Sequence, residues 1–137
     1  MAATKKSDLY VITKAKELAK YVITVTEKSP KKFRFTLVTR LQNYCLDIIE
    51  NLLFANMLPL VEPRRLQHQK EAGRLLNLLG YFSMLCMETT CILPHQFENI
   101  SKLQAESLLF LGKWIKSDQK RNLEKKASSG DMPQKDA

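Results

Sequence analysis

The chain has few of the residues that interrupt helices or cross-link small secreted domains. Its 137 residues include only 4 Gly and 5 Pro, and this scarcity favours long helices. The three cysteines, Cys45, Cys86 and Cys91, are odd in number and lie in apolar segments, which argues against a secreted disulfide framework. The N-terminus shows no apolar signal segment, and no apolar run reaches about 18 residues. We therefore expect a cytoplasmic protein that does not enter a membrane.

The sequence also lacks the common catalytic motifs. It contains no P-loop, no GxGxxG, no HExxH and no nucleophile elbow, and its only histidines are His68 and His95. Cys86, Cys91 and His95 have the spacing C-x4-C-x3-H, but a fourth zinc ligand is missing, and buried cysteines acting as small hydrophobes are the favoured interpretation. We predict a protein that is not an enzyme and holds neither a metal nor a cofactor.

Apolar residues recur at intervals of three and four, which predicts helices over residues 9–27, 30–57, 63–89 and 94–121. Ser29 and Pro30 suit the cap and first turn of the second helix. The expected inward stripe of the third helix is Leu66, Ala72, Leu75, Leu79, Phe82 and Cys86. Short connections between helices predict an all-α, antiparallel up-down-up-down four-helix bundle over residues 9–121, with a flexible stretch over 1–8 and a disordered polar tail over 122–137.

The second predicted helix has more apolar surface than one core needs. At 100° per residue, four apolar side chains fall about 120° to 160° away from the core stripe. They are Phe35, Leu46, Leu53 and Met57. Scattered surface apolar residues are common. Because these four align over several turns, we prefer the interpretation that they form an interface between copies of the chain.

The charge is strongly basic and uneven. The net charge is +8, and residues 1–46 hold ten basic against three acidic side chains. This distribution suggests a polyanionic partner, and a solvated cationic surface is the competing interpretation. In an antiparallel bundle the basic residues gather at its two ends, where Phe33 and Phe35 could stack on bases, although packing in the bundle and in an interface is the more ordinary role. The candidate nucleic-acid-binding residues are Lys28, Lys31, Lys32, Arg34, Arg40, Arg64, Arg65, Lys70, Arg74, Lys113 and Lys116.

Several segments taken in order resemble one known family. These are EKSPKKFRF, RLQNYCLDIIENLLFAN, RRLQHQKEAGRLLNLLGYF and ILPHQFENISKLQAESLLFLGKWIKSD, and the last contains Gly112, Trp114 and Ile115. Over residues 9–118 the chain resembles the accessory variability determinant (Avd) proteins of diversity-generating retroelements. It is more distantly similar to the four-helix-bundle proteins encoded in ribosomal RNA intervening sequences.

The resemblance implies a specific role. It implies a homopentameric barrel without a catalytic site that binds nucleic acid, either RNA or DNA, together with a reverse transcriptase. Such a protein supports mutagenic copying of a template RNA. A protein-binding or structural bundle from a mobile element is the alternative. The third helix reads LNLLGYFSML, with Gly80 and Met84 where the family often has arginines, so the expected contacts move to the cations named above.

Overall fold

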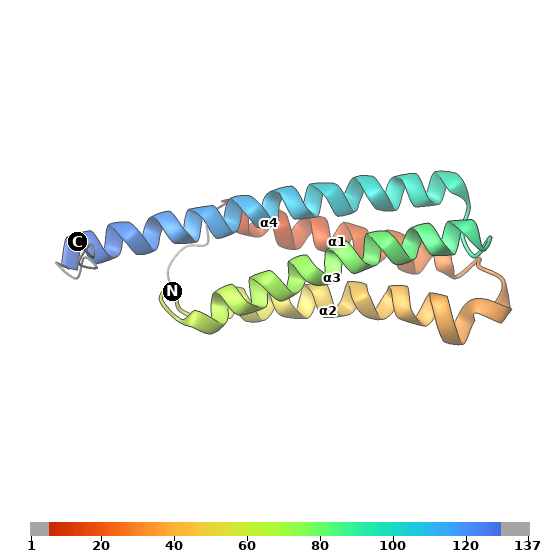
Figure 1. The fold of residues 1–137 in the computed structure, drawn as a ribbon, viewed down its shortest axis with the longest axis horizontal. Coiled ribbons are helices and arrows are strands. Elements are labelled where there is room, and N and C mark those ends of the chain that lie inside the picture. Colours follow the sequence, from red (N-terminus) through yellow and green to blue (C-terminus); the bar gives the residue numbers. More distant parts are fainter. Residues whose placement is uncertain (1–5, 130–137) are drawn as a thin grey trace, which may run out of the picture.

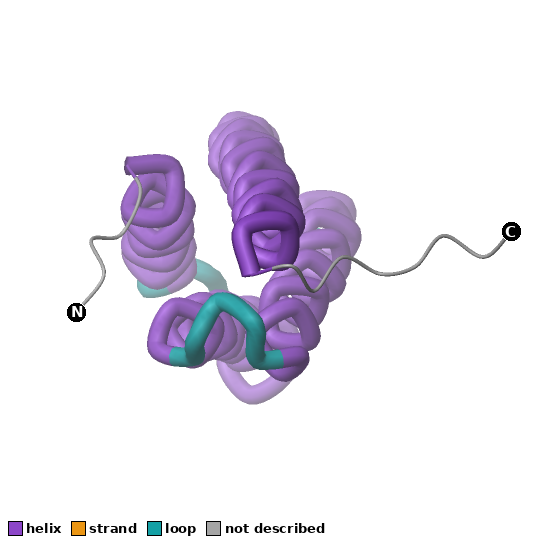
Figure 2. The backbone as a smooth tube through the Cα atoms, turned by 90° about the vertical axis from the view of Figure 1, so that its left-hand side faces the viewer, coloured by secondary structure: helices purple, strands orange, loops and turns teal. Residues whose placement is uncertain are grey.

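The computed structural model describes residues 6–129, and these residues form an all-helical bundle. Four long helices are present, α1 (Lys6–Thr26), α2 (Thr39–Met57), α3 (Pro63–Glu88) and α4 (Pro94–Ser129). They run alternately up and down, as Figure 1 shows. Each helix packs along two neighbours, α1 against α2 and α4, and α3 against α2 and α4. The view along the helices in Figure 2 shows this four-cornered arrangement around one axis.

The buried side chains follow the apolar spacing of the sequence. The core of α1, α2 and α4 is formed by side chains that are fully or almost fully buried, among them Leu18, Leu41, Ile48, Ile100 and Trp114. The third helix, α3, joins through a second set, namely Ala72, Leu75, Leu76, Leu79 and Cys86. The predicted bundle is therefore confirmed as a fold.

The inward seam of α3 starts differently from the prediction. Leu66 is only half-buried, whereas the polar residues Arg65 and Gln69 are buried in its place. The true seam continues the spacing of three and four from Ala72 back through these two residues. A polar seam is stable here because α4 supplies Asp118, a buried carboxylate that pairs with both side chains.

The start of the second helix is also less regular than predicted. A single 3-10 turn, η1 (Lys31–Phe33), and a π-helical turn, η2 (Arg34–Val38), precede α2. Ser29 does not cap this helix. Its hydroxyl instead donates a 2.7 Å hydrogen bond to the carbonyl of Cys91. That bond ties the α1–α2 connection to the α3–α4 connection, so both lie at one end of the bundle.

The last helix continues beyond its predicted end. It reaches Ser129, so residues 122–129, which were expected to belong to a disordered tail, are helical. They include good helix formers and contain neither Gly nor Pro. The predicted flexible residues 1–5 and the rest of the predicted tail, 130–137, lie outside the described residues; α1 begins at Lys6.

One close approach between α3 and α4 depends on a glycine. A Cβ atom on Gly80 would stand 2.7 Å from Nε2 of Gln104. That same amide nitrogen donates a 3.1 Å hydrogen bond to the carbonyl of Leu76. The missing side chain at Gly80 therefore leaves room for a polar contact between the two helices.

Candidate nucleic-acid interface

A compact group of cations occupies the end of the bundle at which α1 leads into α2. Lys28, Lys31, Lys32 and Arg34, here called the α1–α2 basic cluster, are all exposed. No acidic side chain among the described residues forms an ion pair with any of them. Three of the four lie within the short turns η1 and η2, so the backbone geometry holds them close together. Their positive charge is therefore presented to solvent without an ion pair, and the nearby exposed carboxylate is that of Glu27, which lines a hollow with Arg34.

The two phenylalanines in this region have different environments. Phe33 is half-buried and packs against the core, while the Nζ of Lys32 lies 5.1 Å from the centre of its ring. Phe35 is 87% exposed. The structure thus places one ring in the bundle and leaves the other on the surface beside Arg34.

Arg40 extends the positive surface along the groove between α2 and α3. Its guanidinium carbon lies 5.9 Å from the ring centre of Tyr44 and 6.0 Å from that of Phe82. Stacking on two aromatic rings holds the planar cation in place while it stays exposed. It stands where two shallow hollows meet, of about 500 and 410 Å³.

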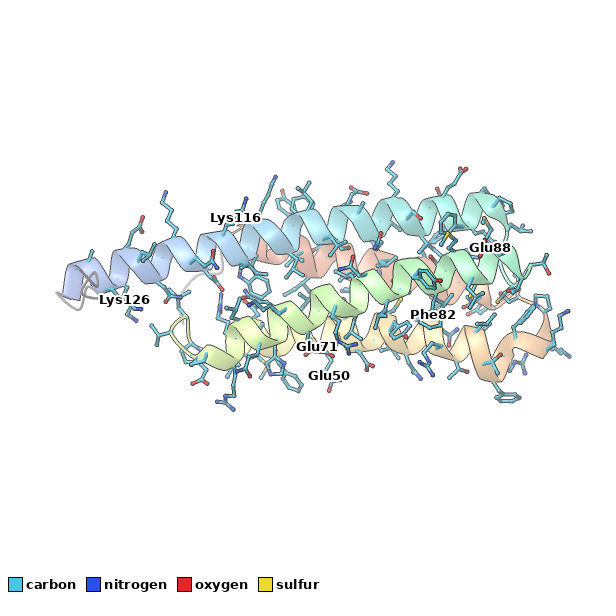
Figure 3. All side chains as sticks on the ribbon, in the orientation of Figure 1. Glu50, Glu71, Phe82, Glu88, Lys116 and Lys126 are labelled. Atoms are coloured by element: carbon cyan, nitrogen blue, oxygen red, sulfur yellow. The ribbon has the colours of Figure 1, made fainter. Side chains whose placement is uncertain are left out.

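Further along this groove the surface turns acidic. Asp47, Glu50 and Glu71 line the second hollow, and Glu50 and Glu71 lie near each other in Figure 3. Arg74, a predicted nucleic-acid contact, is 2.7 Å from a carboxylate oxygen of Glu71. Because its charge is matched there, Arg74 adds little positive potential to the groove. The middle of the α2–α3 face is thus a poor surface for a polyanion.

The opposite end of the bundle contains a buried ionic group, and here one prediction is wrong. Arg65 was predicted to bind nucleic acid, but only 7% of the residue is exposed. Its Nε and Nη2 donate to the two oxygens of Asp118 at 2.7 and 3.0 Å, and its Nη1 donates to the carbonyls of Leu58 and Ala55. Arg65 therefore joins the end of α2 to α4 and cannot reach a phosphate.

The environment of Asp118 is dominated by donors. Burial by itself would raise the pKa of this carboxyl, but hydrogen bonds from Arg65, Gln69 and Arg121, with the charge of Arg65, hold the pKa below its usual value. Asp118 was not among the residues predicted from the sequence. The available signal was its position four residues after Trp114, which places a carboxylate on the inward face of α4.

The remaining predicted cations lie apart from the α1–α2 basic cluster. Arg64 pairs with Glu62 at 2.8 Å, and Lys70 is exposed six residues further along α3. Lys113 and Lys116 are exposed on α4, and Lys116 points away from the bundle on the side opposite Glu50 and Glu71 (Figure 3). The eleven predicted cations therefore do not form one surface, and the densest unpaired group is the α1–α2 basic cluster.

The predicted apolar stripe on the second helix is exposed. Phe35 and Met57 are 87% and 77% exposed, and Leu46 and Leu53 are about half exposed. Phe54, which the sequence analysis did not include, is 44% exposed beside them and contacts the ring of His68. This set, here called the α2 apolar stripe, covers more of one helix than scattered surface residues would.

The cysteines are part of the helix packing. The backbone amide of Cys91 donates to the carbonyl of Cys86, and the backbone amide of Thr90 donates to the carbonyl of Met87. Thr90 itself has a φ of 66°. This is the Schellman arrangement that ends a helix, in which Cys86 and Cys91 supply the usual apolar contact. Burial raises the pKa of Cys45 and Cys86 to about 12, so both remain thiols.

No metal site is found in the described part of the chain. Within residues 6–129, no group of three potential ligands is close enough to hold a metal ion. His95 is exposed, whereas Cys86 and Cys91 are buried. None of the helices within these residues has the length and apolar character needed to cross a membrane.

Comparison with known proteins does not assign this chain to a family. No protein-family model matches it, and no curated protein is a significant match.

Proposed function

We propose that this protein is a non-enzymatic adaptor that binds nucleic acid through the α1–α2 basic cluster. The observation that carries the proposal is the exposure of four cations, three of them in two short turns, without ion-pair partners among the described residues. Phosphate groups are the natural complement of such a cluster, because binding releases the counterions that condense on nucleic acid. Arg40 extends this footprint toward α3.

The adaptor role requires contacts beyond the nucleic acid. We propose that the α2 apolar stripe packs against another copy of the chain, because exposed apolar side chains in this number favour burial. A pentamer and a reverse transcriptase as the protein partner come from the resemblance to the accessory variability determinant proteins alone. In this proposal, several copies bring their basic clusters together and hold template RNA or its DNA copy near the polymerase.

The proposal is tested by reversing charge in the α1–α2 basic cluster. The triple variant Lys31→Glu, Lys32→Glu and Arg34→Glu is compared with a control that reverses three exposed lysines elsewhere, Lys16, Lys20 and Lys102. Both variants change the net charge equally. The affinity for a short single-stranded RNA is measured at several salt concentrations.

We expect the charge reversal to change the salt dependence of RNA binding more clearly than the affinity at any one salt concentration. Three lost phosphate contacts reduce the slope of log K against log salt by about 2 for a single strand, at roughly 0.7 per contact. The control variant should keep most of the wild-type slope. Equal slopes for wild type and the cluster variant would overturn the proposal and favour a protein-binding bundle whose charge serves solubility.

A further inference from the structure

A second candidate site lies at the other end of the bundle, where the α2–α3 connection meets α4. A partly open cavity of about 360 Å³ is formed there. Its apolar walls are Leu60, Val61, Leu66 and Ile115. This volume is in the range of small-molecule sites. The site is separate from the α1–α2 basic cluster, which lies at the far end of the helices (Figure 1).

Two residues that line the cavity have buried side-chain oxygens without a hydrogen-bond donor among the described residues, and the Nε1 of Trp114 is a buried donor without an acceptor. Gln69 is fully buried and lines the cavity; its Nε2 donates to Asp118 at 2.9 Å, and its Oε1 has no partner. Asn122 also lines it, and its Nδ2 donates to the carbonyl of Leu60 while its Oδ1 is buried without a partner. In both side chains the bonded nitrogen fixes which atom is the oxygen. Buried acceptors without donors are costly, so both atoms call for a ligand with N–H or O–H groups.

The remaining polar groups narrow the class of ligand. Four of the thirteen lining residues carry side-chain amides, and four others are charged. The amides are Gln67, Gln69, Gln119 and Asn122, and the charged residues are Glu62, Arg65, Lys70 and Asp118. An amide offers a donor and an acceptor side by side, which matches the edge of a nucleobase. Both carboxylates that line the cavity are already paired, Asp118 with Arg65 and Gln69 and Glu62 with Arg64, so the cavity offers little to a cationic amine. The exposed Lys70 also lines the cavity and suits a phosphate.

We propose that this cavity binds one nucleoside monophosphate unit, with the base between the apolar walls and the phosphate at Lys70. Both oxygens have less than 1 Å² of accessible surface, so a ligand reaches them only when the two side-chain amides turn toward the cavity. The exocyclic amine of adenine, cytosine or guanine would then donate to the oxygens of Gln69 and Asn122. The unit is either a free nucleotide or an unpaired residue of a single strand, because both present the same base and phosphate.

The first experiment titrates the four common nucleoside monophosphates into the full-length protein. Binding is followed by calorimetry and by the side-chain amide NMR signals of Gln69 and Asn122. Two variants address the cavity: Asn122→Leu removes one acceptor, and Val61→Trp fills the space from a position that is 59% exposed. Asn99→Leu is the matched control, since Asn99 lies on the same helix, is exposed and donates to Tyr21. Thermal unfolding of each variant establishes that it is folded.

We expect saturable binding that is weaker for uridine monophosphate than for the three bases with an amine. Asn122→Leu should weaken binding about tenfold, as expected for one lost hydrogen bond to a buried acceptor. Val61→Trp should abolish binding, and Asn99→Leu should leave it unchanged. The proposal is overturned if no nucleotide moves the two amide signals, or if folded Asn122→Leu and Val61→Trp both bind as the wild type does.

A second arm separates the two sources of the nucleotide unit. Single-stranded oligonucleotides are compared with abasic oligonucleotides of equal length. If Val61→Trp weakens only the binding of strands with bases, the cavity takes an unpaired base from nucleic acid; if it affects only mononucleotides, the ligand is a free nucleotide. The charge-reversed variant of the α1–α2 basic cluster should still bind mononucleotides, so failure of this site and failure of the proposed function are distinguishable.

Discussion

Replacing Arg65 tests the conclusion that this residue stabilises the bundle rather than binding nucleic acid. The change Arg65→Met removes the charge and the guanidinium donors but keeps an apolar chain beside Trp114, whose ring lies 5.2 Å from the guanidinium carbon. Four hydrogen bonds are lost, two of them to Asp118. The side chain of Asp118 is 8% exposed, so water cannot fully replace them.

The size of the effect follows from this burial. Removing one member of a buried ion pair costs about 3–5 kcal/mol, because the other charge stays desolvated. Since Gln69 and Arg121 still donate to Asp118, we expect the lower end, about 3 kcal/mol. That is a large part of the roughly 5–15 kcal/mol that stabilises a domain, and it should lower the unfolding midpoint by roughly 10 °C.

This prediction is tested by urea unfolding of the wild type and three variants. The double variant Arg65→Met with Asp118→Leu should be more stable than Arg65→Met alone, because it leaves no unpaired buried charge. Lys70→Met, the same loss of a cation on the exposed side of α3, should change stability by less than about 0.5 kcal/mol. The reasoning is refuted if Arg65→Met is as stable as wild type, or if it lowers the salt slope of RNA binding while Lys70→Met does not.

Three further predictions concern pH, helix propensity and self-association. The folded-state pKa of Asp118 is lowered, so its contribution to stability is present above the unfolded pKa of about 3.9 and is lost as the pH falls through the folded pKa. When the unfolding free energy is measured from about pH 7 to 3, it should therefore fall less steeply in Asp118→Asn than in the wild type. Gly112→Ala should raise the unfolding free energy by up to about 1 kcal/mol, because its new Cβ meets nothing within 4 Å. Gly80→Ala should raise it less, because the new Cβ displaces Gln104, and parallel urea titrations compare the two variants. Leu53→Glu, a charge within the α2 apolar stripe, should reduce the mass seen by light scattering where the wild type self-associates, without loss of helical signal; an unchanged mass would contradict an interface there.

The sequence by itself determined the helices and most of the core. Apolar spacing placed α1 and α3 within three residues of their observed bounds, because a helix must turn one apolar stripe inward whatever it packs against. The same reasoning found the exposed stripe around Leu53 and Met57, since angular position on a helix depends only on residue number. It also located the α1–α2 basic cluster, whose members are close in sequence.

Only the tertiary structure decided whether a side chain is buried or exposed when its partners are distant in sequence. Arg65 and Lys70 are both cations on α3, yet Asp118, fifty-three residues beyond Arg65, makes one of them buried and leaves the other in solvent. The cavity beside Gln69 likewise exists only because the α2–α3 connection packs against α4. Periodicity gives the face on which a residue lies, whereas the partner that meets that face comes from another helix. The energy of a buried charge depends on that partner.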